Sequence, residues 1–321
     1  MLDILRDLLF ADDCALCASS ESEMQRMVDL FSRACKNFGL TISIPKTEVM
    51  FQPAPSETHS IDGQKLANTN KFPYLGSTMS NTATIDDEVS LRLARASASF
   101  GRLSSRVWKR RGLSNETKLK VYHAVVLPSL LYGSETWTVY ARHLQRLESF
   151  HMRCLRQILH VKWQDKVPNT EVLQKAGLMS IRSMLMESQL RWSGHVARMP
   201  NYRLPKRVFF GELNTGRRSR GRPRLRYKDS LKVALKRCNI DTDSWETLAQ
   251  DRVAWRGLVK RGVSAYEQEF IALEVEKRKR RKERLENPPD SVPLYPCPYC
   301  NRSFRAPIAV VSHLRTHPLN I

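Results

Sequence analysis

The sequence predicts an α+β protein in which helices predominate. A small β-rich segment should lie at the N-terminus, followed by a helical body and a tethered ββα module. Three observations predict this: the first fifty residues read as strand, turn, strand, helix and strand; most of the remaining chain carries apolar residues at helical spacing; and residues 294–318 contain paired cysteines and histidines. With 321 residues, 41% of them hydrophobic, the chain can bury at least one core and form two or three domains.

The apolar run LLFADDCALCA at residues 8–18 places Asp12 and Asp13 side by side. Burying two neighbouring carboxylates is costly unless a cation or a polar turn absorbs the charge. We therefore expect a hairpin over Leu8–Leu16 with the aspartates at its turn. Such a hairpin uses aspartate either for turn chemistry or to present two metal ligands at the edge of a sheet, and these residues alone favour turn chemistry.

The next elements follow from local signals. Ser20 and Glu23 form a capping box that starts an amphipathic helix, and Gly39 ends it. LTISIPKTEVMF, residues 40–51, alternates apolar and polar side chains as a strand does, and Pro45 indicates an edge or a bend.

After an Asp62-Gly63 hairpin signal and the segment YLGSTMS, the chain becomes helical. Thr84 and Asp87 should cap a helix that runs to about Val107. Further helices fit residues 115–131, 141–159, 180–198, 225–238 and 244–284.

Two segments, GELNTGRRSRGRPRLRYK and ENPPDSVP, lack apolar periodicity and read as linkers. They divide the chain into a β-rich segment at 1–80, a helical region at 81–210, a basic linker at 211–228, a helical segment at 229–286, a short linker at 287–293 and the ββα module at 294–318.

The charge of the chain indicates a polyanionic partner. Lysine and arginine number 53 against 32 acidic residues, a net charge of +21. Nucleic acid is favoured over an anionic membrane surface, because no basic helix shows a bulky apolar face and no apolar stretch approaches the ~20 residues of a membrane span. Seven scattered cysteines do not resemble a disulfide framework, and the N-terminus lacks the basic start of a signal peptide. We expect a soluble protein in a reducing, nuclear or nucleocytoplasmic compartment.

The strongest motif is Cys297-x2-Cys300-x12-His313-x3-His317. This is the ligand spacing of a ββα zinc finger, in which two histidines share one helical face. Pro307 suits the first turn of that helix. The apolar residues that such a module packs beneath its zinc are also present, at Tyr295, Phe304 and Val310.

The finger does not look like a sequence reader. The positions that contact bases in DNA-binding fingers would fall on Ala306, Ala309 and Ser312, none of which can make a bidentate contact with a base. Ile308 and Val311 add exposed apolar surface instead. We expect contact with a nucleic-acid backbone or with a protein partner.

Three basic segments lie elsewhere. The first holds the expected nucleic-acid-binding residues Arg217, Arg218, Arg220, Arg222, Arg224, Arg226 and Lys228. Its Arg-Gly-Arg-Pro core allows three interpretations: a general phosphate-binding segment, which we favour, an AT-hook or a solvated linker. Lys277–Lys282 could continue a charged helix or act as a nuclear localisation signal. Trp108–Arg111 is the third.

The order of motifs resembles one protein family. FADD, the helix that follows it, GLTISIPKTEVM and KFPYLGSTMS are similar to the later palm motifs of reverse transcriptases, specifically those of non-LTR (LINE-like) retrotransposons. LLYGSETWT, FHMRCLRQIL, LRWSGHVARMP and GRPRLRYKD look like the helical thumb and C-terminal region of the same elements, which often end in a cysteine/histidine zinc motif. The resemblance covers nearly the whole chain.

The resemblance implies specific roles. Asp12 and Asp13 would hold the Mg²⁺ ions that activate the primer 3′-hydroxyl and steady the leaving pyrophosphate. Lys46 would protonate that pyrophosphate. Tyr74 and Gly76 would belong to the primer-grip hairpin and contact nucleic acid.

The family also has fingers and a first palm strand with a further catalytic aspartate, all upstream of the FADD motif, whereas nine residues precede Phe10 here. Asp7 cannot replace that aspartate, because five residues of extended strand place it roughly 16 Å from Asp12 and on the opposite face. The expectation is a truncated reverse transcriptase that does not polymerise alone.

Three functions remain open at this point. The first is an inactive, truncated polymerase that binds RNA or DNA with low sequence specificity. The second is an active polymerase in which another chain supplies the missing fingers and palm strand. The third is a zinc-finger adaptor that binds a protein through Ile308 and Val311. His151 and Cys154 are expected to pack within a helix and not to bind a metal.

Overall fold

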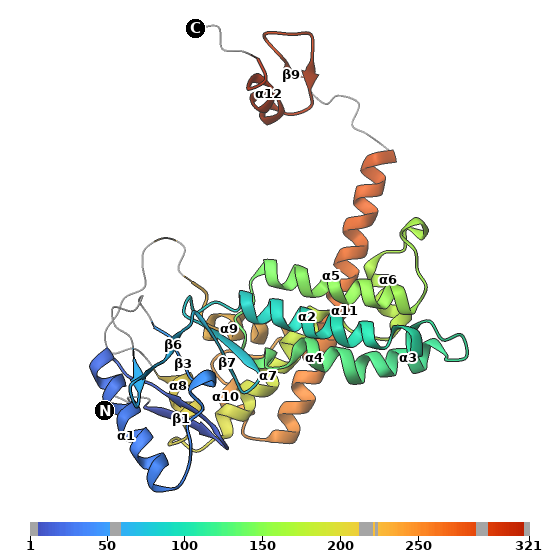
Figure 1. The fold of residues 1–321 in the computed structure, drawn as a ribbon. Helices are drawn as coiled ribbons and strands as arrows, with labels where there is room; N and C mark the ends of the chain where they lie inside the picture. The colour runs from blue at the N-terminus through green and yellow to red at the C-terminus, as the bar shows by residue number, and fades with distance from the viewer. Residues whose placement is uncertain (1–5, 52–58, 212–220, 222–223, 287–294, 318–321) are drawn as a thin grey trace. The chain divides into compact units, whose positions relative to one another are not determined.

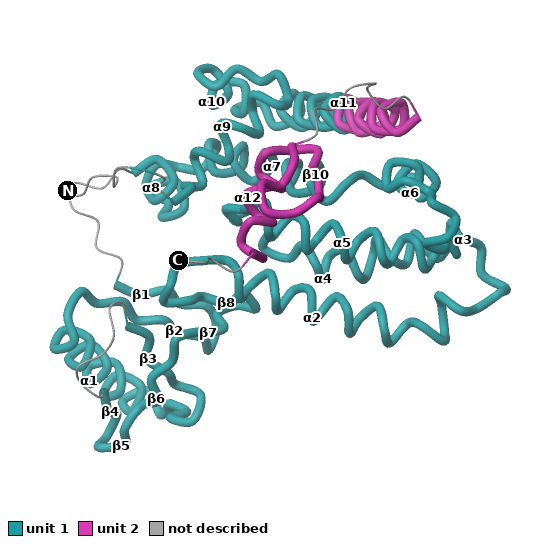
Figure 2. The backbone as a smooth tube through the Cα atoms, turned by 90° about the horizontal axis from the view of Figure 1, so that it is seen from above, with its two compact units in different colours: residues 1–267 teal, residues 268–321 magenta. Residues whose placement is uncertain are grey.

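The computed structural model describes residues 6–51, 59–211, 221, 224–286 and 295–317. Helices predominate, as predicted, and the β structure consists of short strand pairs (Figure 1). The chain divides into two compact units, residues 1–267 and residues 268–321, which Figure 2 shows in different colours.

The β structure of the first unit consists of two-stranded pairs. Three are antiparallel: β1 (Asp7–Phe10) with β2 (Asp13–Leu16), β4 (Ser60–Ile61) with β5 (Gln64–Lys65), and β7 (Lys71–Tyr74) with β8 (Ser77–Ser80). One is parallel: β3 (Glu48–Val49) with β6 (Ala67–Asn68). Within the described residues no two of these pairs join into a larger sheet.

Helix α1 (Glu21–Asn37) begins and ends where the sequence predicts. The Ser20 hydroxyl accepts the Glu23 N–H at 3.2 Å, while the Glu23 carboxylate accepts the N–H of Ser19 at the same distance. At the other end Gly39 adopts a φ of +69°, which a residue with a side chain rarely does.

The strand expected over residues 40–51 is mostly absent. Pro45 lies in a 3₁₀ turn at Ile44–Lys46, and only β3 remains extended and paired. Proline has no N–H to donate to a strand ladder, and the Thr47 hydroxyl donates to the Ser43 carbonyl at 2.9 Å, which stabilises the turn.

Two hairpins turn through consecutive residues with positive φ. These are Asp62-Gly63, at +50° and +79°, and Leu75-Gly76, at +48° and +81°. Two positive φ values in a row are typical of a type I′ turn. The twist of this turn matches the twist of the two strands that it joins. The Asp-Gly hairpin is therefore confirmed, and YLGSTMS also forms a hairpin.

The first helix of the body, α2 (Asp86–Arg102), starts without the predicted cap. Ile85 is the N-terminal cap residue and makes no side-chain cap hydrogen bond. The Thr84 hydroxyl instead contacts the hydroxyl of Thr82 at 3.1 Å, and Asp87 forms an ion pair with Lys71 at 2.7 Å. A π-helical turn at Ser104–Trp108 continues the helical run.

The rest of the body is helical and close to prediction for the longer elements. In chain order these are α3 (Asn115–Val121), α4 (Leu127–Leu131), α5 (Ala141–Ile158), α6 (Asn169–Ala176), α7 (Ile181–Arg198), α8 (Leu204–Phe210), α9 (Tyr227–Arg237), α10 (Trp245–Leu248) and α11 (Arg252–Glu286). The sequence does not predict the two-turn helices α6 and α8. The helix expected over 244–284 is interrupted because the Asp251 carboxylate accepts the N–H groups of Val253 and Ala254 and so starts α11 anew.

Two apolar cores hold the body together, and α7 contributes to both. The first core packs α2 alongside α4 and α5 and includes Trp108, Tyr122, Leu130, Leu147, Leu155 and Ile158. The second lies among α7, α9, α10 and α11 and includes Leu190, Leu235, Trp245, Trp255 and Val259. A third, small core of Val28, Val49, Ile61 and Leu66 lies in the N-terminal region.

The second unit begins within α11. From Gln268 to the end of the helix the side chains are mostly exposed, and ion pairs along the helix join Lys277 to Glu274, Lys279 to Glu283, Arg280 to Glu276 and Lys282 to Glu286. Such pairs stabilise a helix that has little apolar contact. The unit ends in β9 (Tyr295–Pro296), β10 (Ser303–Phe304) and α12 (Pro307–Leu314).

None of the described helices combines the length and the apolarity that a membrane-crossing segment needs.

Candidate metal centre and nucleic-acid interface

The four predicted ligand residues meet in the C-terminal module. Strands β9 and β10 pair antiparallel, and the Cys297 N–H donates to the Arg302 carbonyl at 2.8 Å, closing the turn that carries Cys297 and Cys300. Pro307 starts α12, as predicted, and His313 lies near its end. His317 follows in a tight turn in which the Thr316 N–H reaches the His313 carbonyl at 2.8 Å.

The donor atoms of Cys297, Cys300, His313 and His317 all lie within 4.8 Å of one another, and among the described residues they are the one such group of three or more Cys, His, Asp or Glu. Cys297 Sγ lies 3.3 Å from His317 Nε2, Cys300 Sγ lies 3.2 Å from His313 Nε2, and the two Nε2 atoms are 3.0 Å apart. Tetrahedral zinc separates such donors by roughly 3.3–3.8 Å. The set therefore fits four-coordinate Zn²⁺ with a small outward movement.

The surroundings of Cys297 and His313 favour the forms in which these two side chains bind a metal. Desolvation acts to raise the pKa of the Cys297 thiol, but hydrogen bonds from the N–H groups of Tyr299 and Cys300 and from the Cys300 thiol bring the pKa below its usual value. Desolvation and the neighbouring His317 lower the pKa of His313. Thiolate sulfur and neutral imidazole are the forms that bind a metal.

The outer surface of the finger is basic and apolar. Ile308 and Val311 are 73% and 52% exposed, as predicted. Three arginines of the module, Arg302, Arg305 and Arg315, are also exposed. Guanidinium groups suit phosphate contacts, whereas the small side chains at 306, 309 and 312 offer no base readout.

The aspartate pair lies on the β1–β2 hairpin. Asp12 is in the two-residue turn, where Ala11 has a φ of +51°, and Asp13 is the first residue of β2; both are exposed. Among the described residues the pair does not belong to a group of three possible metal ligands. The magnesium site therefore remains a prediction.

The same hairpin exposes apolar side chains. Leu9 is 60% exposed and Phe10 is 62% exposed. Lys46 is exposed on its 3₁₀ turn, and no hydrogen bond or ion pair between described residues joins it to Asp12 or Asp13. Its predicted role remains untested.

The primer-grip-like hairpin β7–β8 is tied to the aspartate hairpin. The Tyr74 hydroxyl donates to the Leu8 carbonyl of β1 at 3.0 Å. Tyr74, predicted to contact nucleic acid, thus fixes the relation between the two hairpins.

The tip of the β7–β8 hairpin is held by residues that the sequence does not single out. The Gly76 carbonyl accepts hydrogen bonds from Arg92 and from Arg95, the latter at 3.1 Å, and the Leu75 carbonyl accepts the Tyr132 hydroxyl at 3.1 Å. These bonds hold Leu75 in a backbone conformation that leucine otherwise avoids.

A buried ion pair supports this anchor. Arg92 and Glu88 lie one helical turn apart on α2, with Nε–Oε1 at 2.6 Å and both side chains 4% exposed. Glu88 also accepts the Thr78 N–H at 2.7 Å, and the Arg92 guanidinium lies 4.5 Å from the centroid of the Tyr132 ring. The Glu-x3-Arg spacing can be seen in the sequence and predicts an ion pair along a helix. Because the same spacing also occurs on exposed helix faces, it does not predict that the pair is buried.

The predicted basic linker is only partly described. Arg217, Arg218, Arg220 and Arg222 lie outside the described residues. Arg224 donates to the Thr82 carbonyl at 2.9 Å, and Arg226 pairs with Asp229 at 3.6 Å. Lys228 belongs to α9, and its amine donates to the Phe210 carbonyl at 3.4 Å. The helix thus begins at Tyr227, inside the predicted linker.

His151 and Cys154 pack within a helix, as predicted. Both are buried on α5, and His151 Nδ1 lies 2.8 Å from the Tyr122 hydroxyl. Burial lowers the pKa of His151 to about 4, so this imidazole is neutral at physiological pH.

Comparison with known proteins identifies relatives. The chain is 26% identical over 277 residues to a transposon-derived protein of Caenorhabditis elegans, covering 81% of this chain and 97% of that protein. It is 23% identical over 172 residues to RNA-directed DNA polymerases from the mobile element jockey of Drosophila melanogaster and Drosophila funebris. These matches cover 50% of this chain and 19% of each polymerase. No protein-family model and no solved structure matches the chain. These similarities relate the chain to the C-terminal region of non-LTR (LINE-like) retrotransposon reverse transcriptases.

Proposed function

We propose that the chain is a reverse transcriptase-derived protein that binds RNA or DNA with low sequence specificity through a zinc finger and basic surfaces of its helical body. The observation that carries this proposal is the convergence of two cysteines and two histidines on one point, in a module with exposed arginines. The net charge of +21 and the relation to RNA-directed DNA polymerases support the same function.

Binding is tested with the zinc-loaded chain and labelled 20-nucleotide RNA and DNA of several unrelated sequences. Affinities should differ little between sequences and fall about tenfold or more between 50 and 200 mM salt, because phosphate contacts release counterions. Affinity that barely responds to salt would contradict the proposal.

Polymerase activity belongs to the relatives, and for this chain we propose that it does not extend a primer by itself. The exposed Leu9 and Phe10 side chains beside the aspartates support this, since apolar side chains left uncovered on both faces of a hairpin indicate a site that needs further protein surface. Primer extension with Mg²⁺ should give no product. Nucleotide incorporation that Asp12→Ala abolishes would overturn this part of the proposal.

A protein-binding adaptor is the second candidate, and the exposed Ile308 and Val311 favour it. The variant Ile308→Ser/Val311→Ser separates the two functions. It should leave nucleic-acid affinity unchanged if the arginines make the contacts.

A further inference from the structure

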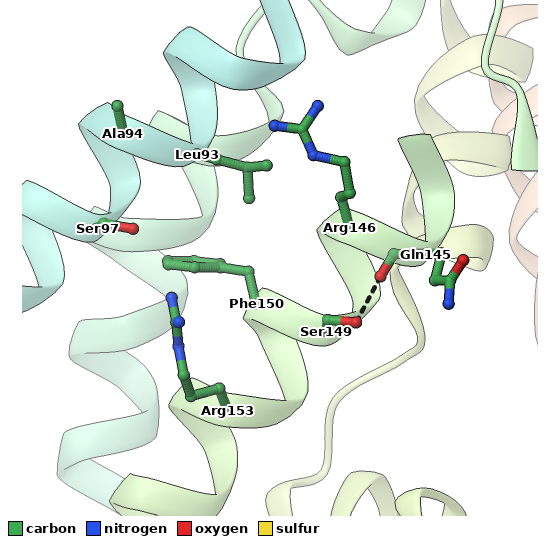
Figure 3. Close-up of a pocket in the computed structure, with 8 residues that line it drawn as sticks. All are labelled: Leu93, Ala94, Ser97, Gln145, Arg146, Ser149, Phe150 and Arg153. Atoms are coloured by element: carbon green, nitrogen blue, oxygen red, sulfur yellow. Dashed lines mark hydrogen bonds between the residues drawn. The ribbon is translucent and has the colours of Figure 1, made fainter. Parts of the chain in front are cut away.

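A groove of about 500 Å³ lies between α2 and α5 of the helical body (Figure 3). The α2 wall presents small side chains, Ala94 and Ser97. The α5 wall presents Arg146, Ser149 and Arg153, and Leu93 and Phe150 lie between the two helices in Figure 3.

The groove is positively charged. Arg146 and Arg153 are exposed, and no acidic side chain lines it. Arg146 Nη2 donates to the Ser90 hydroxyl at 3.0 Å, and the Arg153 guanidinium lies 5.4 Å from the centroid of the Phe150 ring. Asp86, one turn before Ser90, is already bonded to Arg142 and His143, which hold its pKa well below the usual range.

The spacing of the two arginines suits an extended ligand. They lie seven positions apart on α5, or about 10.5 Å along its axis. This spacing is too long for a single phosphate group and suits two different phosphates of one strand. The small side chains of the α2 wall allow a nucleic-acid strand to lie close, and the Ser97 hydroxyl is within the same lining. The Ser149 hydroxyl already donates to the Gln145 carbonyl at 2.7 Å (Figure 3).

The apolar residues of the groove do not offer base recognition. The Phe150 side chain is buried, at 5% exposure, so its ring cannot stack on a base. What remains accessible is positive charge and hydroxyl groups, which recognise a sugar–phosphate backbone without regard to sequence.

We propose that the α2–α5 groove binds the sugar–phosphate backbone of one nucleic-acid strand through Arg146 and Arg153. This inference rests on the proposed nucleic-acid-binding function and names a surface that performs it. Neither arginine belongs to the basic segments that the sequence pattern singles out.

The test compares two double variants of the full, zinc-loaded chain on 12-nucleotide single strands. Arg146→Gln/Arg153→Gln should lower affinity about tenfold at 50 mM salt. It should also flatten the dependence of log affinity on log salt by about 1.4, since each single-strand phosphate contact contributes about 0.7. The affinities for RNA and for DNA of the same sequence should fall by equal factors. Arg256→Gln/Arg261→Gln removes the same charge from exposed positions of α11 outside the groove and should change affinity less than about twofold.

A gain-of-function variant excludes misfolding as the cause. Ser97→Lys adds a cation to the α2 wall and should strengthen binding and steepen the salt dependence by about 0.7. The matched control is Ser264→Lys, which adds a cation at an exposed position of α11. This control should strengthen binding less than Ser97→Lys does.

Three results would overturn the inference, and they are distinguishable. If the unmodified chain binds no oligonucleotide, the proposed function fails and the inference with it. If the unmodified chain binds but both double variants lose affinity equally, only the groove assignment fails. A self-association in sedimentation that only Arg146→Gln/Arg153→Gln abolishes would instead assign the groove to a second copy of the chain.

Discussion

The helical body and the C-terminal finger differ in how much apolar surface they bury. The body buries large apolar side chains in two cores, including four that are less than 2% exposed: Trp108, Trp255, Leu130 and Leu190. In the described part of the finger, residues 295–317, Cys297 is the one buried residue, with 6% of its surface exposed. The body therefore relies on removing apolar surface from water, whereas the finger buries little such surface and, as we propose, depends on bonds to a metal held by its four clustered donors.

This difference can be measured in a single molecule. All six tryptophans lie between residues 108 and 255 and none lies in the finger. Tryptophan fluorescence consequently follows the body alone, and the amide NMR signals of residues 295–317 follow the finger.

The largest expected effect is loss of the metal. Chelation, or Cys297→Ser, should unfold the finger, because structural zinc supplies about 10–16 kcal/mol of apparent binding free energy to such modules. The finger's amide signals should collapse while the fluorescence-detected Tm of the body stays within about 2 °C. A larger shift in the body would show that the two regions are not independent.

The next effect concerns the body alone. A Cβ at Gly194 would lie 2.1 Å from Trp255 Nε1, where the indole packs on α7 and donates to the Leu190 carbonyl at 3.0 Å. Gly194→Ala should therefore lower the free energy of unfolding by roughly 3 kcal/mol in urea titrations. Gly101→Ala is the matched control, since a Cβ there meets no atom within 4 Å and should leave stability unchanged or raised. Equal effects would contradict the close packing.

Acid should weaken the body through His151. Its pKa is about 4 in the fold and 6.5 when unperturbed, so the unfolded chain binds more protons between these values and stability falls as pH drops from 6.5 to 4. Over this whole pH range the free energy of unfolding should fall by about 3 kcal/mol. Urea unfolding at pH 7, 5.5 and 4.5 measures it, and His151→Gln should show a shallower pH dependence. An unchanged slope in that variant would assign the loss to other groups.

The smallest effect lies where α11 leaves the body. The buried Glu267 carboxylate accepts the N–H of Ser180 at 2.9 Å and the hydroxyls of Ser180 and Ser183 at 2.6 and 2.5 Å. Glu267→Gln should lower the free energy of unfolding of the body by about 1–2 kcal/mol, because a neutral amide accepts these hydrogen bonds less well than a carboxylate. Glu269→Gln, exposed on the same helix, should be neutral, and the finger should respond to neither. A response of the finger would indicate coupling along α11.

Features that depend on near neighbours were predictable. The cap at Ser20 and the Asp62-Gly63 turn need partners only a few residues away, so their residue types carry the signal. The ligand spacing of the finger is equally local, since a strand pair and one short helix bring all four donors together. Residues 40–51 show the limit of such reasoning, because alternation predicted a strand where Pro45 imposes a turn.

The sequence by itself determined the longer helices, the clustering of the four candidate metal ligands and the relation to reverse transcriptases. Only the tertiary structure decided that Arg92 and Tyr132 anchor the hairpin at the carbonyls of Gly76 and Leu75, respectively. It alone also decided that Arg146 and Arg153 face small side chains of α2 across a groove. It also placed the Lys228 amine 3.4 Å from the Phe210 carbonyl, while the predicted nucleic-acid contact of Lys228 stays a prediction. The physical reason is distance along the chain: these partners lie 16 to 57 residues apart, and no short-range pattern states which helix faces will meet.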